Sequence, residues 1–316
     1  MMKKINDIIG DAKTIGIAGH LRPDGDCMGS CMSLYNYLKK NRPDLDVRVF
    51  LEFVDKKFNI IENTDQIITT GYDGTKFDLF ISLDTASLDR LGLNLPFYEN
   101  AKRTACIDHH ASNDGYADYN YILPKASSAS EVLYDLLDED LIDKSIAEPM
   151  YMGIAHDSGV FRFQSTTPKT MRIAANMIEK GVNVNMILEE TFFRKTYNQM
   201  MVTAKIQSEA VLALDGKCIY GYCTSEMMEE YGVTTKDLDA VVASIRNVDG
   251  VEGAMFLYQL SEDSYKVSLR SKNYVDVSKI AVENGGGGHV RAAGAEIHGE
   301  LNDIINKLLN RIKQDI

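Results

Sequence analysis

The chain has 316 residues, enough for two domains that each bury their own core. Hydrophobic residues make up 45% and charged residues 25%, as in globular proteins, and no apolar run reaches membrane-spanning length. The net charge of −12 argues against broad, sequence-independent binding to long nucleic acid, which needs a basic surface, but it allows a small anionic substrate.

Cysteine usage and the first residues indicate the compartment. There are five cysteines, an odd number, and none are arranged as C-x-x-C, which favours reduced thiols. The start, MMKKINDIIG, lacks the long apolar core of a signal peptide. We therefore expect a cytoplasmic protein.

The first half of the chain alternates strand-like and helix-like segments. Four short apolar segments predict strands, at Thr14–Gly19, Asp46–Leu51, Asp78–Asp84 and Thr104–Asp108. Helical patterns lie between or after them, at Met28–Lys40, Ser128–Leu137, Ile146–His156 and Lys169–Lys180. This alternation predicts an α/β domain over residues 1–185 with a mainly parallel, doubly wound sheet, whose ligands bind beyond the carboxyl ends of the strands.

A long segment without proline or glycine follows the first domain. Its apolar residues, from about Val184 to Leu214, recur at helical spacing, so we expect a connecting helix over residues 186–214. Residues 215–316 then predict a smaller α/β domain with a mixed sheet. Its elements are strands at Cys218–Cys223, Gly253–Leu260 and Tyr265–Ser271 and helices at Val277–Glu283 and Leu301–Ile312.

Histidine and aspartate gather where the predicted strands and one helix of the first domain end. They are His20, Asp24, Asp26, Asp84, Asp108, His109, His110, His156 and Asp157. A mixed His/carboxylate set suits Mn²⁺, Fe²⁺, Co²⁺ or Zn²⁺ better than Ca²⁺. One metal ion would not use so many carboxylates, whereas two ions that share a carboxylate would. Asp84, alone at a strand end, is the expected bridge.

Each of these residues also has an ordinary explanation. A lone aspartate at a strand end is more often a helix cap or a turn former. The stretch RPDGD is a common turn sequence, and His109-His110 could be a surface pair. These explanations are independent of one another, so all of them would have to be true at once at successive strand ends. A metal site is the better hypothesis.

The second domain contains a glycine run, Gly285–Gly288, followed by His289 and Arg291. Glycines leave backbone amides uncovered, so the run predicts a phosphate-binding loop; the alternative is a flexible loop. Arg270, at the end of a predicted strand, is a candidate bidentate partner for phosphate. Arg162, in VFRF, is a further candidate, and we expect the phenylalanines around it to be core residues.

The motifs together resemble a known superfamily. HLRPDGDCMGS, LDTAS, IDHHASN and GIAHDSGVFRF are similar to the four motifs of the DHH phosphoesterases, and SLRS and GGGGHVRAAG are similar to the DHH-associated domain. Within the superfamily the chain most resembles the stand-alone nanoRNase/pAp-phosphatase group. Its members trim very short oligonucleotides and dephosphorylate 3′-phosphoadenosine 5′-phosphate (pAp).

The resemblance implies a role for each matching residue. His20 and Asp24 would bind one metal ion, Asp26, His109 and Asp157 the other, and Asp84 would bridge them. His110 would face the scissile phosphate, and Asp108 would orient a neighbouring histidine; His156 has no implied role. Among catalytic residues we thus count His110, Asp84 and Asp108. The implied substrate-binding residues are Arg270, Gly286, Gly287, Gly288, His289, Arg291 and Arg162.

The resemblance implies hydrolysis of a phosphoester by a hydroxide activated by two metal ions, Mn²⁺ first and Mg²⁺ or Co²⁺ as alternatives, in a cleft between the domains. The expected partner is a short oligonucleotide or nucleotide, without long nucleic acid or membrane, and a homodimer stays open. Three rival functions remain. They are a cyclic-dinucleotide or pApA phosphodiesterase, an inorganic pyrophosphatase or exopolyphosphatase of the same superfamily, and a non-catalytic nucleotide-binding module.

Overall fold

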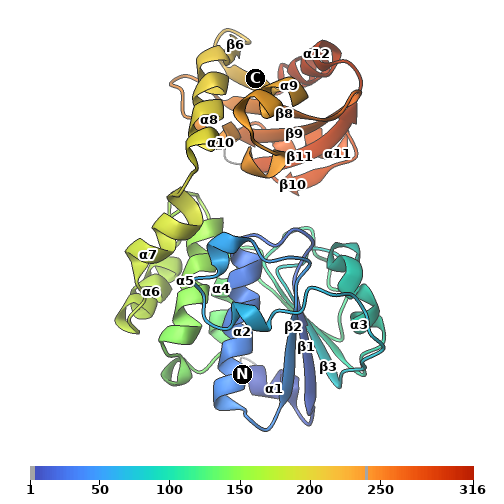
Figure 1. Ribbon diagram of the computed structural model, residues 1–316, viewed down its shortest axis with the longest axis vertical. Helices are drawn as coiled ribbons and strands as arrows, with labels where there is room; N and C mark the ends of the chain where they lie inside the picture. The colour runs from blue at the N-terminus through green and yellow to red at the C-terminus, as the bar shows by residue number, and fades with distance from the viewer. Residues whose placement is uncertain (1–3, 239–240) are drawn as a thin grey trace. The chain divides into compact units, whose positions relative to one another are not determined.

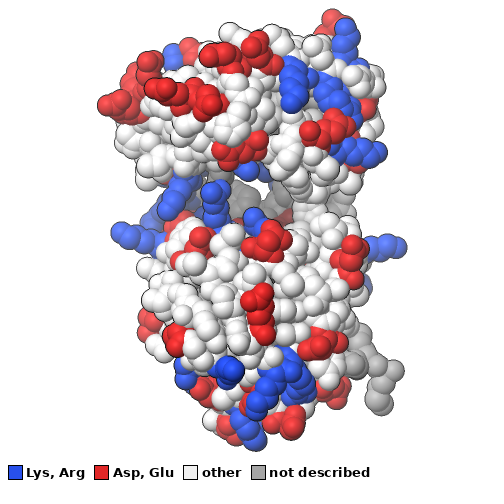
Figure 2. All heavy atoms as spheres, turned by 90° about the vertical axis from the view of Figure 1, so that its right-hand side faces the viewer, with Lys and Arg blue, Asp and Glu red and all other residues white. Residues whose placement is uncertain are grey.

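The computed structural model describes residues 4–238 and 241–316. The chain divides into two compact units, Met1–Arg194 and Lys195–Ile316 (Figure 1). None of the described helices is both long and apolar enough to cross a bilayer. On the face drawn in Figure 2, acidic and basic side chains are interspersed in small groups and form no continuous basic surface, in keeping with the net charge of −12.

The first unit is built on a sheet of five parallel strands in the order β2-β1-β3-β4-β5. The strands are β1 (Thr14–Ala18), β2 (Asp46–Phe50), β3 (Leu79–Leu83), β4 (Thr104–Asp108) and β5 (Tyr119–Ile122). The predicted parallel sheet is confirmed, and β5 is an additional edge strand. Because the strand order reverses between β1 and β3, a crevice is expected at the carboxyl ends of these two strands.

Helices cover both faces of this sheet (Figure 1). The larger core lies under α2 (Gly25–Asn41), α4 (Ala129–Leu136) and α5 (Lys144–Asp157), with α1 (Ile5–Ile9) and α6 (Pro168–Glu179) at its borders. The smaller core is aromatic and lies under α3 (Leu95–Glu99). Strand β1 serves both cores: Ile15 and Ile17 face the larger one, and a Cβ on Gly16 would lie 2.5 Å from the ring of Phe80.

Helices α2 and α5 touch through their backbones. A Cβ on Gly29 of α2 would lie 2.4 Å from the carbonyl oxygen of Pro149 and 2.8 Å from the amide nitrogen of Gly153, both in α5. Glycine is therefore required at position 29 for this close approach. The contact fixes the start of α2 next to the end of α5.

The prediction of one connecting helix is wrong. The chain forms α7 (Val184–Leu188) and a π-helical turn at Glu189–Phe193, and a new helix, α8 (Tyr197–Glu209), then begins after Thr196. The hydroxyl of Thr196 accepts a hydrogen bond from the amide of Gln199 at 3.1 Å, and the Gln199 side chain accepts one from the amide of Thr196 at 2.8 Å. This capping box starts a second helix where the apolar spacing alone predicts continuity.

The second unit holds a mixed six-stranded sheet in the order β10-β11-β9-β8-β7-β6, as the sequence predicts in kind. Among the strands that the structure describes in this unit, only β7 and β8 pair in parallel. The strands are β6 (Val211–Ala213), β7 (Cys218–Cys223), β8 (Gly253–Ser261), β9 (Ser264–Ser271), β10 (Gly287–His289) and β11 (Ala292–His298). One face packs on α11 (Val277–Val282) and α12 (Leu301–Ile312), the other on α8, α9 (Ser225–Tyr231) and α10 (Val241–Ile245).

Candidate metal centre

All six predicted metal ligands lie close together at one edge of the first unit's sheet. His20 follows β1, Asp84 follows β3 and His109 follows β4, so parallel pairing brings all three to the carboxyl ends of neighbouring strands. The remaining three belong to helix ends. Asp24 and Asp26 lie at the start of α2, and Asp157 is the last residue of α5.

The first group consists of His20, Asp24 and Asp84, whose candidate ligand atoms lie within 4.8 Å of one another. His20 Nε2 is 3.4 Å from Asp84 Oδ2 and 3.8 Å from Asp24 Oδ1. The other ring nitrogen, Nδ1, donates a 2.7 Å hydrogen bond to the carbonyl oxygen of Leu21. Since that carbonyl can only accept, Nε2 is the unprotonated nitrogen of a neutral His20 and faces the carboxylates.

The second group consists of Asp26, His109 and Asp157, again within 4.8 Å of one another. His109 Nε2 is 3.1 Å from Asp157 Oδ2 and 3.5 Å from Asp84 Oδ1. Asp84 therefore turns one carboxylate oxygen to His20 and the other to His109. This is the arrangement that a carboxylate shared by two metal ions requires.

The residues present fit divalent metal ions. Asp84 is only 2% exposed, and its buried Oδ1 forms no hydrogen bond within the part of the chain that the structure describes. Burial, together with the charges of Asp84 and Asp157, raises the pKa of Asp26 well above its ordinary value. Carboxylates crowded in this way need a positive charge between them, and mixed nitrogen and oxygen donors suit ions such as Mn²⁺.

The carboxylates in turn favour the protonated form of the neighbouring histidines. Burial works against a charged His109, but the carboxylates of Asp157 and Asp84 outweigh it and raise its pKa well above the ordinary value. Burial works against a charged Asp84 too, yet His109 and His20 hold its pKa well below the usual range. Metal ions would have to displace these protons, so their binding must weaken as the pH falls.

A hydrogen-bonded chain fixes the orientation of His110. Its Nδ1 donates a 2.8 Å hydrogen bond to Asp108 Oδ1, and Asn113 Nδ2 donates a 2.7 Å hydrogen bond to Asp108 Oδ2. Asp108 is fully buried. Burial opposes protonation of the half-buried His110, but Asp108 raises its pKa above the ordinary value. The nitrogen turned away from Asp108 is thus Nε2. The sequence did not single out Asn113.

Helix starts hold the two aspartates of the first motif. Asp24 caps α2, where its Oδ1 accepts hydrogen bonds from the amides of Asp26 and Cys27 at 3.0 and 3.1 Å. The carboxylate of Asp26 accepts hydrogen bonds from the amides of Ala129 and Ser130, at 2.5 and 3.0 Å, at the start of α4. Asp26 is therefore positioned by a helix far away in the sequence, which the sequence motif does not indicate.

His156 is not part of either group. Its Nε2 donates a 2.9 Å hydrogen bond to the hydroxyl of Thr191, which itself donates to the carbonyl oxygen of Ile187. Burial, with the charge of Lys57, lowers the pKa of His156 to about 4, so its ring is neutral near pH 7. The ring occupies the space that a side chain at Gly25 would need, since a Cβ there would lie 2.1 Å from it.

The glycine run forms an edge strand and not an open loop. Residues Gly287, Gly288 and His289 make up β10, which pairs with β11. A Cβ on Gly286 would lie 2.1 Å from the carbonyl oxygen of Gly294, and one on Gly288 would lie 2.6 Å from that of Ala292. These two glycines are therefore needed for the close pairing itself. His289 is exposed on the strand.

The predicted arginines differ in their surroundings. Arg291 donates from Nη1 to the carbonyl oxygen of Val275 at 2.7 Å and from Nη2 to that of Asn273. Its guanidinium thus anchors the loop before α11, a role that its position after the glycine run did not predict. Arg270, at the end of β9, donates to the carbonyl oxygen of Leu269 at 2.9 Å, and Arg162 is exposed beyond the end of α5.

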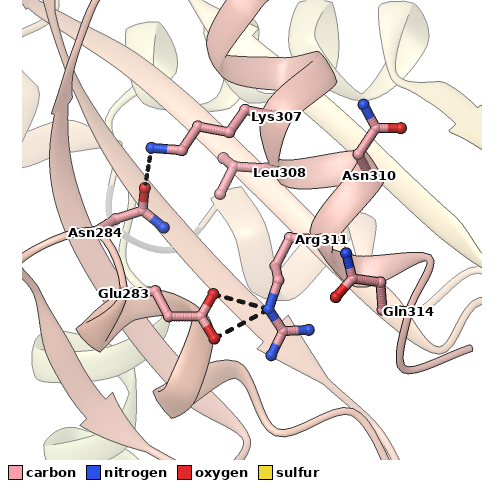
Figure 3. A pocket seen from close by; sticks show the side chains of 7 residues that line it. All are labelled: Glu283, Asn284, Lys307, Leu308, Asn310, Arg311 and Gln314. Atoms are coloured by element: carbon pink, nitrogen blue, oxygen red, sulfur yellow. Dashed lines mark hydrogen bonds and ion pairs between the residues drawn. The ribbon is translucent and has the colours of Figure 1, made fainter.

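A hollow of about 420 Å³ lies in the second unit between the end of α11 and α12 (Figure 3). Lys307 Nζ donates to Asn284 Oδ1 at 2.7 Å and Arg311 Nε to Glu283 Oε2 at 2.8 Å across it. None of the predicted site residues lines it, and its charged side chains bond to neighbours in its own lining, Arg311 to Glu283 and Lys307 to the amide of Asn284. We do not consider it the functional site.

Known proteins match the chain along most of its length. The DHH family, N-terminal domain, matches residues 14–154 and the DHHA1 domain residues 215–315. The bifunctional oligoribonuclease and PAP phosphatase NrnA of Thermus thermophilus is 31% identical over 313 residues, which cover 96% of this chain and 90% of that protein. The protein of the same name from Bacillus subtilis is 27% identical over 290 residues, 90% of each chain.

A solved structure shares the fold. The exopolyphosphatase-related protein of Bacteroides fragilis superposes with a TM-score of 0.89 at 23% identity, covering 98% of this chain and 95% of that one. At this identity the likeness shows the fold alone. The two domain matches and the 31% identical relative carry the assignment: the chain belongs to the DHH family and combines its N-terminal domain with a DHHA1 domain.

Proposed function

We propose that this chain is a metal-dependent phosphoesterase that hydrolyses short oligonucleotides, pAp or both. The observation that carries the proposal is the position of Asp84, whose two carboxylate oxygens face His20 and His109 in separate ligand groups. The names of the relatives, oligoribonuclease and PAP phosphatase, support the substrate class.

The proposed cofactors are two divalent metal ions, with Mn²⁺ as the first choice and Mg²⁺ or Co²⁺ as alternatives. One would be held by His20 and Asp24, the other by Asp26, His109 and Asp157, with Asp84 common to both. The list of donors, two imidazoles and four carboxylates, supports a borderline ion over Ca²⁺. When bound, such ions supply Lewis-acid activation of water and of the phosphate.

His110 is the proposed proton-transfer and hydrogen-bonding group. Asp108 holds its Nδ1–H, so Nε2 is directed away from that carboxylate and can meet a phosphate oxygen or the leaving oxygen. The raised pKa of His110 supports a role as donor, because a protonated imidazole both neutralises charge on phosphate and can give up its proton.

The second unit is proposed to capture the rest of the substrate. Exposed His289 on β10, Arg270 at the end of β9 and the amides of Gly287 and Gly288 are the candidate phosphate contacts, with Arg162 of the first unit. The predicted contact at Gly286 is not kept, because its amide donates a 2.8 Å hydrogen bond to the carbonyl oxygen of Ala281. Arg291 is proposed to act through the loop that it anchors. The five cysteines are all reduced and buried, which supports a cytoplasmic enzyme. A homodimer stays a prediction.

A substrate panel tests the proposal. Purified enzyme is incubated with pAp, pApA, RNAs of two to five nucleotides, cyclic dinucleotides and pyrophosphate, each with Mn²⁺ or Mg²⁺. We expect Mn²⁺-stimulated release of phosphate from pAp or of mononucleotides from the RNAs, and no release by an Asp84→Asn variant with the same far-ultraviolet spectrum. Turnover of pyrophosphate alone, or none at all, would overturn the proposal.

A further inference from the structure

The turn that follows α5 has a strained backbone. Gly159, Val160 and Phe161 have φ values of 58°, 56° and 61°, three successive residues in the left-handed region. This region is uncommon for any non-glycine residue and an outlier for a β-branched one such as Val160. Buried Ser158 helps to hold the turn, because its hydroxyl accepts a 3.0 Å hydrogen bond from the amide of Phe161. Such strain is concentrated at functional sites.

The turn sends its two phenylalanines in different directions. Phe161 packs on the core residue Tyr151 with ring centroids 5.9 Å apart, as expected from the sequence. The expectation that Phe163 is also a core residue is wrong, because Phe163 is 44% exposed. Its amide donates a 2.9 Å hydrogen bond to the carbonyl oxygen of Ser158, which brings the chain back beside the end of α5.

The ring of Phe163 lies against the backbone of Gly159. A Cβ at Gly159 would be 2.4 to 2.7 Å from three atoms of this ring. One side of the ring is therefore supported by a buried glycine, and the exposed remainder faces away from it. Gly159 is only two residues from Asp157, the ligand at the end of α5. The chain thus holds a supported, exposed aromatic ring against a residue that lies two positions after the candidate ligand Asp157.

We propose that Phe163 is a stacking platform for the nucleobase of the nucleotide whose phosphate lies at the metal centre. This inference rests on the proposed function and narrows it to substrates that carry a base. Phenylalanine has no polar group for a phosphate, whereas an exposed aromatic face binds any base by stacking. Exposed Arg162 precedes the ring and adds positive charge beside it. A polyphosphate or pyrophosphate would gain nothing from such a ring.

A binding experiment follows from the composition, because the chain has no tryptophan. A Phe163→Trp variant therefore carries a single indole at the proposed platform. With Mg²⁺ present, we expect AMP to quench its emission saturably and ribose 5-phosphate, which lacks the base, to leave it unchanged. The control is Leu141→Trp. Leu141 is similarly exposed, at 43%, and lies just before the first residue of α5, whereas Phe163 follows the last residue of this helix. AMP should not quench the control.

Kinetics give a second, independent test. Phe163→Ala should lower kcat/KM for pAp by about 5- to 150-fold, the range measured for loss of one base–aromatic stack. It should lower kcat/KM for the base-free analogue 1-deoxyribose 3,5-bisphosphate less than twofold. Phe163→Tyr should restore activity on pAp, and Leu141→Ala should match the wild type on both substrates.

The outcomes separate this inference from the proposed function. Wild-type turnover of pAp combined with equal losses on both substrates in Phe163→Ala would overturn the platform and leave the phosphoesterase in place. The stacking platform would also be overturned if AMP did not change the emission of the Phe163→Trp variant. Base-dependent quenching in an enzyme that hydrolyses none of the nucleotides would support the platform and refute the proposed function.

Discussion

His110 Nδ1 donates a 2.8 Å hydrogen bond to Asp108 Oδ1, so a fully buried carboxylate fixes the orientation of this imidazole and keeps the proton on Nδ1. We predict that Asp108→Asn lowers kcat by about 100-fold, the usual scale for disturbing a proton-transfer group. An amide in place of the carboxylate no longer stabilises the protonated ring. The measurement is kcat on pAp together with metal content by atomic emission. A drop in kcat explained entirely by lost metal would assign Asp108 to the metal centre instead.

Asp84 offers the sharpest test of a shared ligand. Asp84 has a φ of 51°, in the left-handed region, where asparagine is tolerated better than most residues, so Asp84→Asn should fold. We predict that turnover falls by at least about 1,000-fold and that metal content falls for both ions, because a neutral amide cannot serve two cations. Metal titration by calorimetry measures the second effect. Loss of one ion with the other retained would contradict the bridge.

The two imidazoles lead to a prediction about the preferred metal ion. We predict higher kcat/KM with Mn²⁺ than with Mg²⁺, since His20 and His109 supply nitrogen donors that Mg²⁺ binds poorly. Enzyme stripped by a chelator is assayed on pAp with each ion freed of trace metal. Equal activity in Mg²⁺ would instead indicate a site dominated by its four carboxylates.

His289 tests the contribution of the second unit. We predict that His289→Ala leaves metal content unchanged, lowers kcat/KM sharply for pAp and has far less effect on bis-p-nitrophenyl phosphate, which has no second phosphate. Binding energy away from the reacting atoms improves catalysis only for substrates that can use it. Losses of equal size on both substrates would place His289 in the chemical step, and no loss on either would remove it from the site.

Glu252 provides a prediction on pH and stability. It is 3% exposed, and its carboxylate accepts hydrogen bonds from the amides of Asn273, Tyr274 and Val275. Burial opposes its ionisation, but these amides prevail and lower its pKa. We predict that Glu252→Gln destabilises the second unit by about 2 to 3 kcal/mol at pH 7, the scale of losing a hydrogen-bonded charge.

The sign of the pH dependence follows from the lowered pKa. The unfolded chain, with a Glu pKa of about 4.3, takes up a proton before the folded chain does, so the stabilisation is full above that value. It is lost as the pH falls through the folded-state pKa, and the wild-type and Glu252→Gln proteins should converge there. Urea unfolding, monitored by hydrogen exchange of the amides of residues 273–275, measures this pH dependence of the stability. Glu283→Gln, which removes only a surface ion pair with Arg311, is the control and should change little.

The sequence predicts the parallel sheet and the gathering of polar residues because both leave local signals. Short apolar runs mark β1 to β4, and parallel pairing brings the residues that follow them to one edge. Strand β5, with the sequence YNYI at the sheet edge, lacks an apolar run and gives no such signal. Glycines have no side chains, so hydrophobic periodicity cannot reveal that Gly287 and Gly288 pair as a strand.

Other features depend on contacts between distant segments or on backbone angles. The break before α8 comes from two polar residues, Thr196 and Gln199, that fit equally well on the exposed side of a continuous helix. The exposure of Phe163 results from positive φ angles at Val160 and Phe161, which the amino-acid types argue against. The hydrogen bonds from α4 to Asp26 join segments 103 residues apart.

The backbone contact of α2 and α5 at Gly29 and Gly153 sets a distance within the candidate metal centre. These helices carry Asp26 and Asp157, so the separation between the two carboxylates is set by how closely two main chains can approach. A methyl group at Gly29, which is no proposed ligand, would push the helices apart and separate the two carboxylates while leaving every candidate donor in place. If these carboxylates hold a metal ion as proposed, the size of the preferred cation is linked to a contact between two glycines, and enlarging them should shift the preference toward larger cations before it abolishes binding.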